Sequence, residues 1–399
     1  MAMNEHRRVL MLGPGPQVRG GITAVIRAYI QNGIGLYQLE WLSTYSDRSS
    51  LRKITAAGRA FVLGLVRIPR NDIIHIHAAW SMSFWRKTVF FVMARCFRKK
   101  TVVHLHAPAF DGFRRNPLKL CSRWVFTRAD AVIALSETWA REIRTIAPRA
   151  NVHVVPNPCE APAELATPLA DRQPIVLFSG QLESRKGFRD VIRAMPAVLA
   201  RVPEATLVMA GHGEVEEAEA LARFLGIEQH VQCLGWITGE KKAAVLSRAR
   251  VFCLPSYGEG LPMSMLEAMS YGIPVVVTAV GSIPDVITNG DNGVVVEPGD
   301  VAGISEAILL TLLQTHQAQR MADAAVQIVR QNFSPDHVGA SVSRLYDSLG
   351  ASVRVRSPRS CGEQTFSTRH DAECSAKGKP EGETSLMLAG TRDKKEQTV

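Results

Sequence analysis

The architecture of this chain can be predicted from Arg8–Ile30, which reads RVLMLGPGPQVRGGITAVIRAYI. The stretch begins with a short apolar run that is typical of a buried β-strand, and glycine and proline then interrupt the pattern. From Ile22 onward, apolar side chains recur with the spacing of an amphipathic helix. A buried strand, a glycine-rich turn and a helix form a βα unit, so the chain is predicted to open a parallel α/β sheet.

The same alternation of strand and helix continues along the chain. Short runs rich in β-branched residues are separated by helix-length segments, and they begin near residues 72, 101, 131, 152, 174, 205, 231, 251, 275 and 293. A proline-rich segment divides them into two series, so a linker is expected at 158–172. We therefore predict an α/β fold with two tandem Rossmann-like, doubly wound domains that face each other across a cleft. Such folds bind their ligands at the carboxyl ends of the strands.

The boundaries of four segments follow from these patterns. One Rossmann-like domain is expected at 1–160 and a second at 161–335. A C-terminal helix at 336–350 is expected to pack back toward the first domain. From residue 351 the chain is rich in Ser, Thr, Gly, Lys and Glu and has little apolar periodicity, so 351–399 is expected to be a disordered tail.

The composition is that of a globular protein and excludes several classes of protein. No apolar run reaches the roughly 18 residues that a membrane-spanning helix needs. The first eight residues carry charges directly before the first strand, which is not the pattern of a secretory signal. The seven cysteines show no metal-binding spacing. We expect a cytoplasmic protein whose thiols are reduced and whose sequence offers no metal site built from cysteine.

The net charge of +10 is distributed unevenly. Residues 1–160 carry 24 Lys and Arg against 9 Asp and Glu, whereas residues 161–350 carry 14 against 21. The excess is concentrated at 48–128, where large apolar side chains accompany 17 basic residues. Basic amphipathic helices of this kind bind anionic membrane surfaces, which we expect here. The alternative is a set of core helices with a solvated basic edge, and no nucleic-acid-binding module accompanies the charge.

The most informative motif lies at 254–278, which reads LPSYGEGLPMSMLEAMSYGIPVVVT. Glu259 is predicted in a glycine-flanked loop after a strand, and Glu267 on the following helix. A helical rise places their Cα atoms about 10–12 Å apart. Glycosidase carboxyl pairs lie closer, about 5–9.5 Å apart. The spacing favours two carboxylates that contact different parts of one extended ligand, and the alternative is a buried helix with one solvated and one capping glutamate.

This motif and its neighbours resemble the E-x7-E region of retaining GT-B glycosyltransferases, family 4 or "group 1". The resemblance extends forward through Asn292–Asp300 and back to Phe178–Gly187, which reads FSGQLESRKG and is similar to the family's G-R-L-x-x-x-K-G segment. Upstream, the runs DAVIALSE at 130–137 and VVPNP at 154–158 resemble the end of the family's first domain. In total the resemblance covers about residues 8–347. It implies an acceptor-side first domain and a second domain that binds a nucleotide sugar.

The resemblance also implies roles for individual residues of the second domain. Glu267 matches the family position that holds the ribose hydroxyls, and Glu259 matches the one that contacts the donor sugar. Lys186, with Arg185 beside it, matches the lysine that binds the donor diphosphate, whose charge grows as the glycosidic bond breaks. Backbone N–H groups around Gly260 and Leu261 are expected to assist.

One position departs from the family's pattern. Gln181 stands where the family usually has an arginine. Glutamine can hydrogen bond to a phosphate but supplies no charge. Either Arg185 or another basic residue is expected to compensate, or the activity is reduced.

In the first domain, the resemblance points to a glycine pair and a histidine. Gly20 and Gly21 resemble the family's glycine-rich first loop, and glycines before a helix expose backbone N–H groups to an anion. A plain tight turn is the alternative interpretation. His106 matches the histidine that approaches the donor sugar. Asp111 is expected either to orient a substrate hydroxyl or to cap a helix.

Two pairs of histidines stand two residues apart on predicted strands, His75 with His77 and His104 with His106. Side chains two residues apart share one face of a strand, so a four-histidine metal site is conceivable. No carboxylate accompanies them with the spacing of a metal ligand. We therefore interpret His75, His77 and His104 as buried, hydrogen-bonded histidines and expect no metal.

The sequence thus implies a retaining, metal-independent glycosyltransferase that uses a nucleotide-diphosphate sugar and no separate cofactor. Its acceptor is expected to be a glycan or a lipid-linked sugar in bacterial exopolysaccharide or surface-glycan synthesis. The protein is expected to associate peripherally with the inner face of the cell membrane, and nucleic acid is not expected as a partner. Two alternatives stay open: a nucleotide-sugar epimerase of the same fold, and a non-catalytic donor-binding or membrane scaffold.

Overall fold

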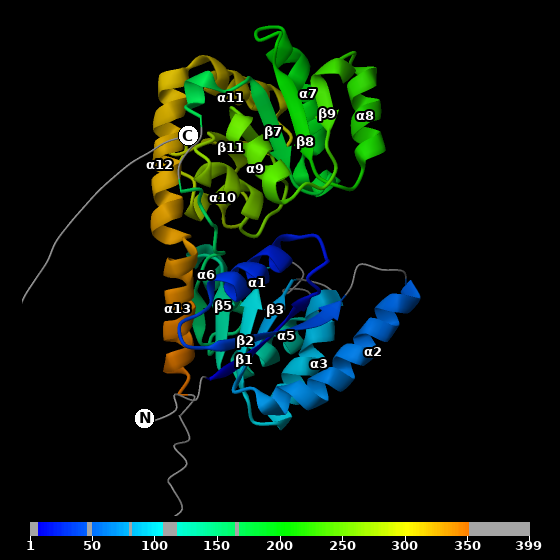
Figure 1. Cartoon of the computed structure of the whole chain (residues 1–399), viewed down its shortest axis with the longest axis vertical. Helices are drawn as coiled ribbons and strands as arrows, with labels where there is room; N and C mark the ends of the chain where they lie inside the picture. The colour runs from blue at the N-terminus through cyan, green and yellow to red at the C-terminus, as the bar shows by residue number, and fades with distance from the viewer. Residues whose placement is uncertain (1–6, 46–49, 80–81, 107–117, 164–166, 351–399) are drawn as a thin grey trace, which may run out of the picture. The chain divides into compact units, whose positions relative to one another are not determined.

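Each half of the chain forms one six-stranded parallel β-sheet (Figure 1). The computed structural model describes residues 7–45, 50–79, 82–106, 118–163 and 167–350. The expectations for Asp111 and for the tail at 351–399 lie outside these residues. We call the part up to β6 the N-terminal lobe and the part from β7 to α12 the C-terminal lobe.

The sheet of the N-terminal lobe has the strand order β2-β1-β3-β4-β5-β6. Its elements, in chain order, are β1 (Arg8–Pro14), α1 (Gly21–Asn32), β2 (Gln38–Tyr45), α2 (Ser50–Arg67), η1 (Ile68–Arg70), β3 (Ile73–Ala78), α3 (Met82–Cys96), β4 (Lys100–Leu105), α5 (Leu118–Arg128), β5 (Ala131–Ala134), α6 (Glu137–Ile146) and β6 (Val152–Val154). The order of the strands reverses between β1 and β3. The edge strand β2 is missing from the series read from the sequence, because it mixes polar and apolar residues and lies at the rim of the sheet.

The sheet of the C-terminal lobe has the order β12-β11-β10-β7-β8-β9, the strand order of the Rossmann fold. Its elements are η2 (Leu169–Asp171), β7 (Ile175–Ser179), η3 (Ser184–Lys186), α7 (Phe188–Leu199), β8 (Thr206–Ala210), α8 (Val215–Phe224), η4 (Glu228–His230), β9 (Val231–Cys233), α9 (Gly239–Arg248), β10 (Val251–Leu254), α10 (Met263–Ser270), β11 (Val275–Thr278), η5 (Ile283–Asp285), β12 (Val294–Val296), α11 (Val301–Leu313) and α12 (Thr315–Asn332). Here the order reverses between β7 and β10. The expected α/β class with two Rossmann-like domains is confirmed.

Alternating side chains of the N-terminal sheet enter two separate cores. On β3, Ile74 and Ile76 join the core under α2, α3, α5 and α6, whereas Ile73 joins the core under α1 and α13 (Pro335–Ser348). Because side chains two residues apart share a face, His75 and His77 lie on the second face. Burial on both faces explains why the strands are continuous apolar runs.

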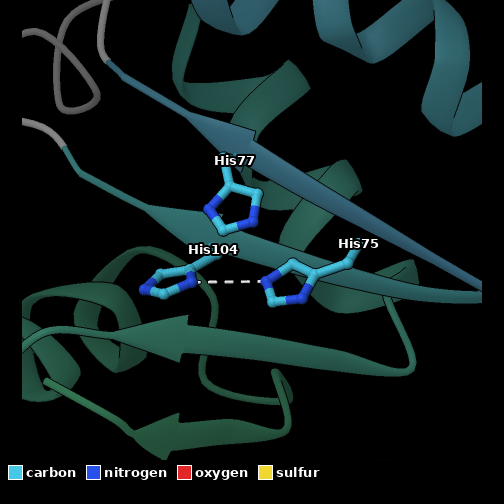
Figure 2. A group of neighbouring side chains, drawn as sticks. All are labelled: His75, His77 and His104. Atoms are coloured by element: carbon cyan, nitrogen blue, oxygen red, sulfur yellow. Dashed lines mark hydrogen bonds between the residues drawn. The ribbon is translucent and has the colours of Figure 1, made fainter. Parts of the chain in front are cut away.

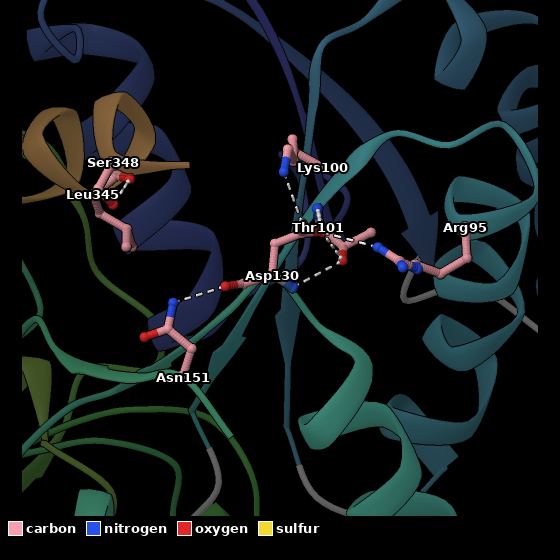
Figure 3. Close-up of polar contacts among 7 residues, drawn as sticks. All are labelled: Arg95, Lys100, Thr101, Asp130, Asn151, Leu345 and Ser348. Carbon is pink, nitrogen blue, oxygen red and sulfur yellow. Dashed lines mark hydrogen bonds and ion pairs between the residues drawn. The ribbon is translucent and has the colours of Figure 1, made fainter. Parts of the chain in front are cut away.

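Asp130, just before β5, ties the starting edges of neighbouring strands together (Figure 3). Its carboxylate accepts hydrogen bonds from the backbone N–H of Thr101 at 3.0 Å and from the Thr101 hydroxyl at 3.0 Å. Arg95 and Lys100 contribute ion pairs at 3.1 and 3.2 Å. The Asn151 amide donates to the Asp130 carbonyl oxygen at 2.8 Å. This residue of the DAVIALSE run is therefore structural.

The last helix, α13, follows the C-terminal lobe but is packed in a core of the N-terminal lobe. Its residues Val338, Val342, Leu345 and Tyr346 are buried beside β1 and α1. The Tyr346 hydroxyl lies 2.5 Å from His75 Nδ1. None of the helices in the described ranges combines the length and the apolar character needed to cross a bilayer.

Truncation of Tyr346 tests how much this helix contributes. Tyr346→Ala removes a fully buried aromatic ring and the hydroxyl that meets His75. We expect the free energy of unfolding to fall by about 3–5 kcal/mol, as for other buried aromatic truncations, measured by urea denaturation. Arg344→Ala, at an exposed position of the same helix, is the control and should change stability by no more than about 0.5 kcal/mol. Equal effects of both variants would contradict the packing of α13.

Candidate active site

Lys186 and Glu259 meet where the strand order of the C-terminal sheet reverses. Lys186 ends η3, shortly after β7, and Glu259 lies in the loop after β10. Since β7 and β10 are neighbours in the sheet, the two loops leave the same edge side by side. Lys186 Nζ forms an ion pair with Glu259 Oε1 across 73 positions of sequence.

The carboxylate of Glu259 is buried and held by several groups. Its side chain is 5% exposed, and that of Lys186 is 14% exposed. The Ser256 hydroxyl donates to the same oxygen, Oε1, at 2.8 Å. Arg185 Nη1 lies 3.9 Å from the other oxygen, Oε2. Ser256, Arg185 and Lys186 thus supply hydrogen-bonding and charged partners to the buried carboxylate, and the ion pair holds Lys186 at the edge of the site.

Arg185, which was expected to assist at the diphosphate, makes its contacts with residues of the two neighbouring loops. Its Nη1 donates to the Gly258 carbonyl oxygen at 2.5 Å, and its Nη2 pairs with Glu183. The backbone N–H of Tyr257 donates to the Arg185 carbonyl oxygen at 2.7 Å. Arg185 therefore joins the η3 loop to the loop that carries Glu259.

The backbone around Glu259 is packed against the loop that follows β11. Gly281 has φ +63°, and a Cβ added there would lie 2.0 Å from the Glu259 carbonyl oxygen. The next residue, Ser282, donates its N–H to the Gly260 carbonyl oxygen at 2.9 Å. Only glycine at 281 allows this approach, so the position of Glu259 depends on it.

Glu267 forms a separate ion pair. It is on α10, and its Oε1 pairs with Lys242 Nζ of α9 at 2.5 Å. The two glutamates of the motif thus pair with different lysines.

The remaining expected donor-site residues lie on three loops. Gly20 immediately precedes α1 and Gly21 begins it, and a Cβ on Gly21 would lie 3.7 Å from Met263 Cγ at the start of α10. Gln181 is exposed between β7 and η3. The carbonyl oxygen of Leu261 accepts a hydrogen bond from Asn157 Nδ2 at 3.0 Å.

The four histidines form a two-by-two array on the face of the N-terminal sheet that α1 covers. Across the strands, His75 Nε2 lies 3.2 Å from His104 Nδ1, and His77 Nδ1 lies 3.1 Å from His106 Nε2. Along the strands, the rings are stacked, with centroids 4.3 Å apart for His75 and His77 and 4.2 Å apart for His104 and His106. Figure 2 shows three members of this array.

These imidazoles are neutral at physiological pH. Burial lowers the pKa of His75 and of His106 to about 3. Burial, helped by the neighbouring rings, also places the pKa values of His77 and His104 well below the usual range. Each ring therefore carries one N–H and one lone pair.

The array suits hydrogen bonding better than metal binding. One nitrogen from each of His75, His77 and His104 lies within 4.8 Å of the others, close enough for a metal ion to be considered. However, the rings of His75 and His77 are stacked with their planes inclined by only 12°, so their in-plane lone pairs lie in nearly parallel planes and do not converge on one point. The geometry favours the interpretation as buried, hydrogen-bonded histidines.

Asn157 lies beside the candidate site, and the sequence analysis named it only within the run VVPNP at 154–158. It is buried, it bonds to Leu261 of the C-terminal lobe, and it is a neighbour of His106 that influences its pKa. The feature of the sequence that could have drawn attention to Asn157 is its place between two prolines, whose fixed φ angles make the segment stiff. Sequence alone did not distinguish this from an ordinary turn.

Both lobes of the chain match family models of glycosyltransferases. A model described as "Glycosyl transferase 4-like domain" matches residues 6–158, and one described as "Glycosyl transferases group 1" matches residues 164–327. Glycogen synthase of Mycobacterium tuberculosis is 28% identical over 330 residues, which cover 77% of this chain and 76% of that protein. A phosphatidyl-myo-inositol mannosyltransferase of Mycobacterium leprae is 27% identical, with 72% and 76% covered.

Two solved structures share the fold of the chain. Sucrose-phosphate synthase of Thermosynechococcus elongatus has a TM-score of 0.72 at 19% identity, covering 87% of this chain and all of that one. Anabaena HepE, solved in complex with UDP-glucose, has a TM-score of 0.69 at 18% identity, covering 86% of this chain and all of that one.

Substitution of Gly281 tests the packing behind Glu259. Gly281→Ala is expected to destabilise the protein by about 1–3 kcal/mol through its backbone conformation alone, and further because the new Cβ would displace the Glu259 carbonyl. Gly290→Ala is the matched control, since Gly290 has φ +82° but open space around it. Denaturation should show a clearly larger loss for Gly281→Ala. If the two losses are the same, the close approach is not what fixes Glu259.

The neutral histidine array predicts a pH dependence of stability. In the unfolded chain a histidine has a pKa of about 6.5, whereas the folded values for His75 and His106 are about 3. Between these values the unfolded state binds more protons, so stability should fall as pH drops below about 6.5, by up to about 1.4 kcal/mol per pH unit for each histidine. In denaturation curves recorded across this range, His75→Phe should reduce the slope, and an unchanged slope would contradict a buried neutral His75.

Proposed function

Because the chain belongs to the group 1 glycosyltransferases, we propose that it moves a sugar from a nucleotide-diphosphate donor to a glycan or lipid-linked acceptor, with retention of configuration. The observation that carries the proposal is the ion pair of Lys186 and Glu259 where the strand order reverses. In an open α/β sheet this is the place where nucleotide ligands bind.

Lys186 is proposed to bind the donor diphosphate. Its ammonium is positioned by Glu259 and lies at the carboxyl end of β7. When the bond between the sugar and the phosphate breaks, negative charge grows on the departing diphosphate, and a cation already in place stabilises that charge without reorganisation. The N–H groups of Gly20 and Gly21, at the start of α1, would face the same anion.

Glu259 and His106 are proposed to position the donor sugar, and Glu267 to hold the ribose hydroxyls. In the transfer step, the bond from the anomeric carbon to the phosphate oxygen breaks, and a bond to the acceptor oxygen forms on the same face. The departing phosphate takes the proton of the acceptor hydroxyl. We propose that no divalent metal is needed, since Lys186 and the helix-terminal N–H groups supply positive charge at the phosphate.

A thermal-shift screen against UDP-, GDP-, dTDP- and ADP-sugars without added metal tests this proposal. UDP-sugars come first, because HepE has the same fold and was solved with UDP-glucose. A ligand that binds the native state raises the melting temperature. We expect a shift with one nucleotide class that is lost in Lys186→Ala and in Glu267→Ala. Lys241→Ala, beside Lys242 on α9, is a control that should keep the shift.

The remaining outcomes separate the alternatives. Donor turnover that requires an acceptor supports transfer, whereas conversion of the donor without an acceptor would identify an epimerase. Donor binding without either reaction would identify a scaffold. If no nucleotide sugar shifts the melting temperature, the proposed donor site is wrong.

The basic region at 48–128 is proposed to place the protein on an anionic membrane, at the inner face where lipid-linked acceptors of exopolysaccharide or surface-glycan synthesis are used. Three helices of this region are contiguous: Gly64 of α2 packs against Phe90 of α3, and Phe91 of α3 meets Trp124 of α5. They expose apolar side chains to solvent, namely Phe61, Val62, Leu65, Val66, Val89, Val92, Leu120 and Trp124. Exposed basic side chains stand among them, namely Arg59, Arg95, Lys119, Arg123 and Arg128.

Sedimentation with vesicles tests this surface. The protein should bind vesicles of phosphatidylcholine with phosphatidylglycerol more tightly than phosphatidylcholine alone, because cations gain from anionic lipid. Leu65→Glu, which places a negative charge among the exposed apolar residues, should reduce binding. Phe224→Glu, at an exposed apolar position of α8, is the matched control and should bind as the unaltered protein does. Equal binding to both vesicles would refute the proposed surface.

A further inference from the structure

The protonation of His106 is determined by the ring beside it. His77 lies opposite His104 where β3 pairs with β4, and each of them has a second histidine two residues away in its own segment. His77 Nδ1 and His106 Nε2 are 3.1 Å apart, which is a hydrogen bond that one ring must donate and the other accept. Each of the two rings is neutral and has a single N–H to give.

Two assignments of the protons are possible, and they differ at His77 Nε2. This atom is buried and has no hydrogen-bond partner among the described residues. If His77 Nδ1 accepted the bond, the proton would lie on Nε2 as a buried, unpaired N–H group. If Nδ1 donates, Nε2 is an unpaired lone pair. Buried unpaired N–H groups are the rarer of the two in proteins, so the second assignment is favoured.

The assignment also determines where His106 carries its proton. With Nε2 accepting from His77, the proton of His106 lies on Nδ1. Asn157 is a neighbour of His106. Its Nδ2 donates to the Leu261 carbonyl oxygen, and its Oδ1 is buried with no hydrogen-bond partner in the described part of the chain. Within the described residues, the N–H on His106 Nδ1 is therefore not given to Asn157.

We propose that His77 is a positioning residue that holds His106 in the tautomer protonated on Nδ1, so that His106 meets the donor sugar as a hydrogen-bond donor. The role of His106 toward the sugar rests on the proposed function above. A neutral ring with its proton on Nδ1 can donate to a sugar hydroxyl oxygen. It has no lone pair on that nitrogen, so it does not act there as a base.

The tautomer is read directly by NMR of protein labelled with ¹⁵N-histidine. Nitrogens that carry a proton differ strongly in ¹⁵N chemical shift from those that do not, and the correlations through the ring hydrogens assign Nδ1 and Nε2. The spectrum of His106, identified from its loss in His106→Phe, should show a protonated Nδ1 in the unaltered protein. A protonated Nε2 on His106 would overturn the proposal.

Two substitutions of His77 test its role in fixing that tautomer. His77→Phe keeps a stacked ring but removes the donor, so the proton of His106 should move to Nε2 or be shared. His77→Asn places an N–H near the position of Nδ1 and should keep the native tautomer. His106 that stays protonated on Nδ1 in His77→Phe would overturn the role of His77. If His77→Phe does not fold, the native spectrum and His77→Asn still decide the question.

Kinetics with an active donor supply a second readout. His77→Phe should lower kcat/KM for the donor about tenfold, the value of one hydrogen bond, and His77→Asn should restore most of it. Equal losses in both variants would overturn the proposal, since they would report only a disturbed core. The NMR result does not depend on turnover, so failure of the proposed glycosyl transfer and failure of this inference are distinguishable.

Discussion

The parallel pairing of β7 with β10 is the constraint on which the candidate site depends. Their paired positions are 75 residues apart in sequence, because the chain first builds β8 and β9 on one side of β7 and then returns to the other side to add β10. The return places the loop with Glu259 beside the loop with Lys186. The ion pair follows from that placement, whereas the Ser256 hydrogen bond is made within the Glu259 loop and Gly281 approaches from the loop after β11.

The two lobes contribute different chemistry. The C-terminal lobe supplies charge, with Lys186 and Lys242 each beside a glutamate. The N-terminal lobe supplies neutral groups, because burial under α1 and α13 keeps the histidine array uncharged. Asn157 connects them, since it bonds to Leu261 and is a neighbour of His106. We propose that a charged diphosphate and a neutral sugar are bound by these two kinds of surroundings.

Much of the fold could be predicted from sequence because strands buried on both faces are continuous apolar runs. The edge strand β2 was missed because a strand at the rim does not need that pattern. Spacing and resemblance singled out Glu259, Glu267 and Lys186 as candidate donor-site residues, and their roles stay predictions. Their partners were not predictable: Gly281 and Lys242 become relevant only when the fold brings separate segments together, and the Ser256 hydrogen bond depends on the local loop conformation.

The contacts among the histidines could not be predicted from the sequence either. Their spacing indicated that each pair shares a strand face, but the register between β3 and β4 decides which rings meet. The register sets His77 opposite His104, and the positions of the rings then bring His77 to His106 and His75 to His104. The choice between a metal centre and hydrogen-bonded rings depends on ring inclination, which no sequence pattern encodes.

The central claim is that Lys186, held beside Glu259, binds the donor diphosphate. Calorimetric titration of the nucleoside diphosphate alone into Lys186→Ala and Glu259→Gln tests it most directly, once the base is known. The account predicts that Lys186→Ala weakens binding about tenfold or more, whereas Glu259→Gln, which removes a negative charge but keeps a hydrogen-bonding group beside the ammonium, binds at least as tightly as the unaltered protein. An equal weakening in both variants would contradict it.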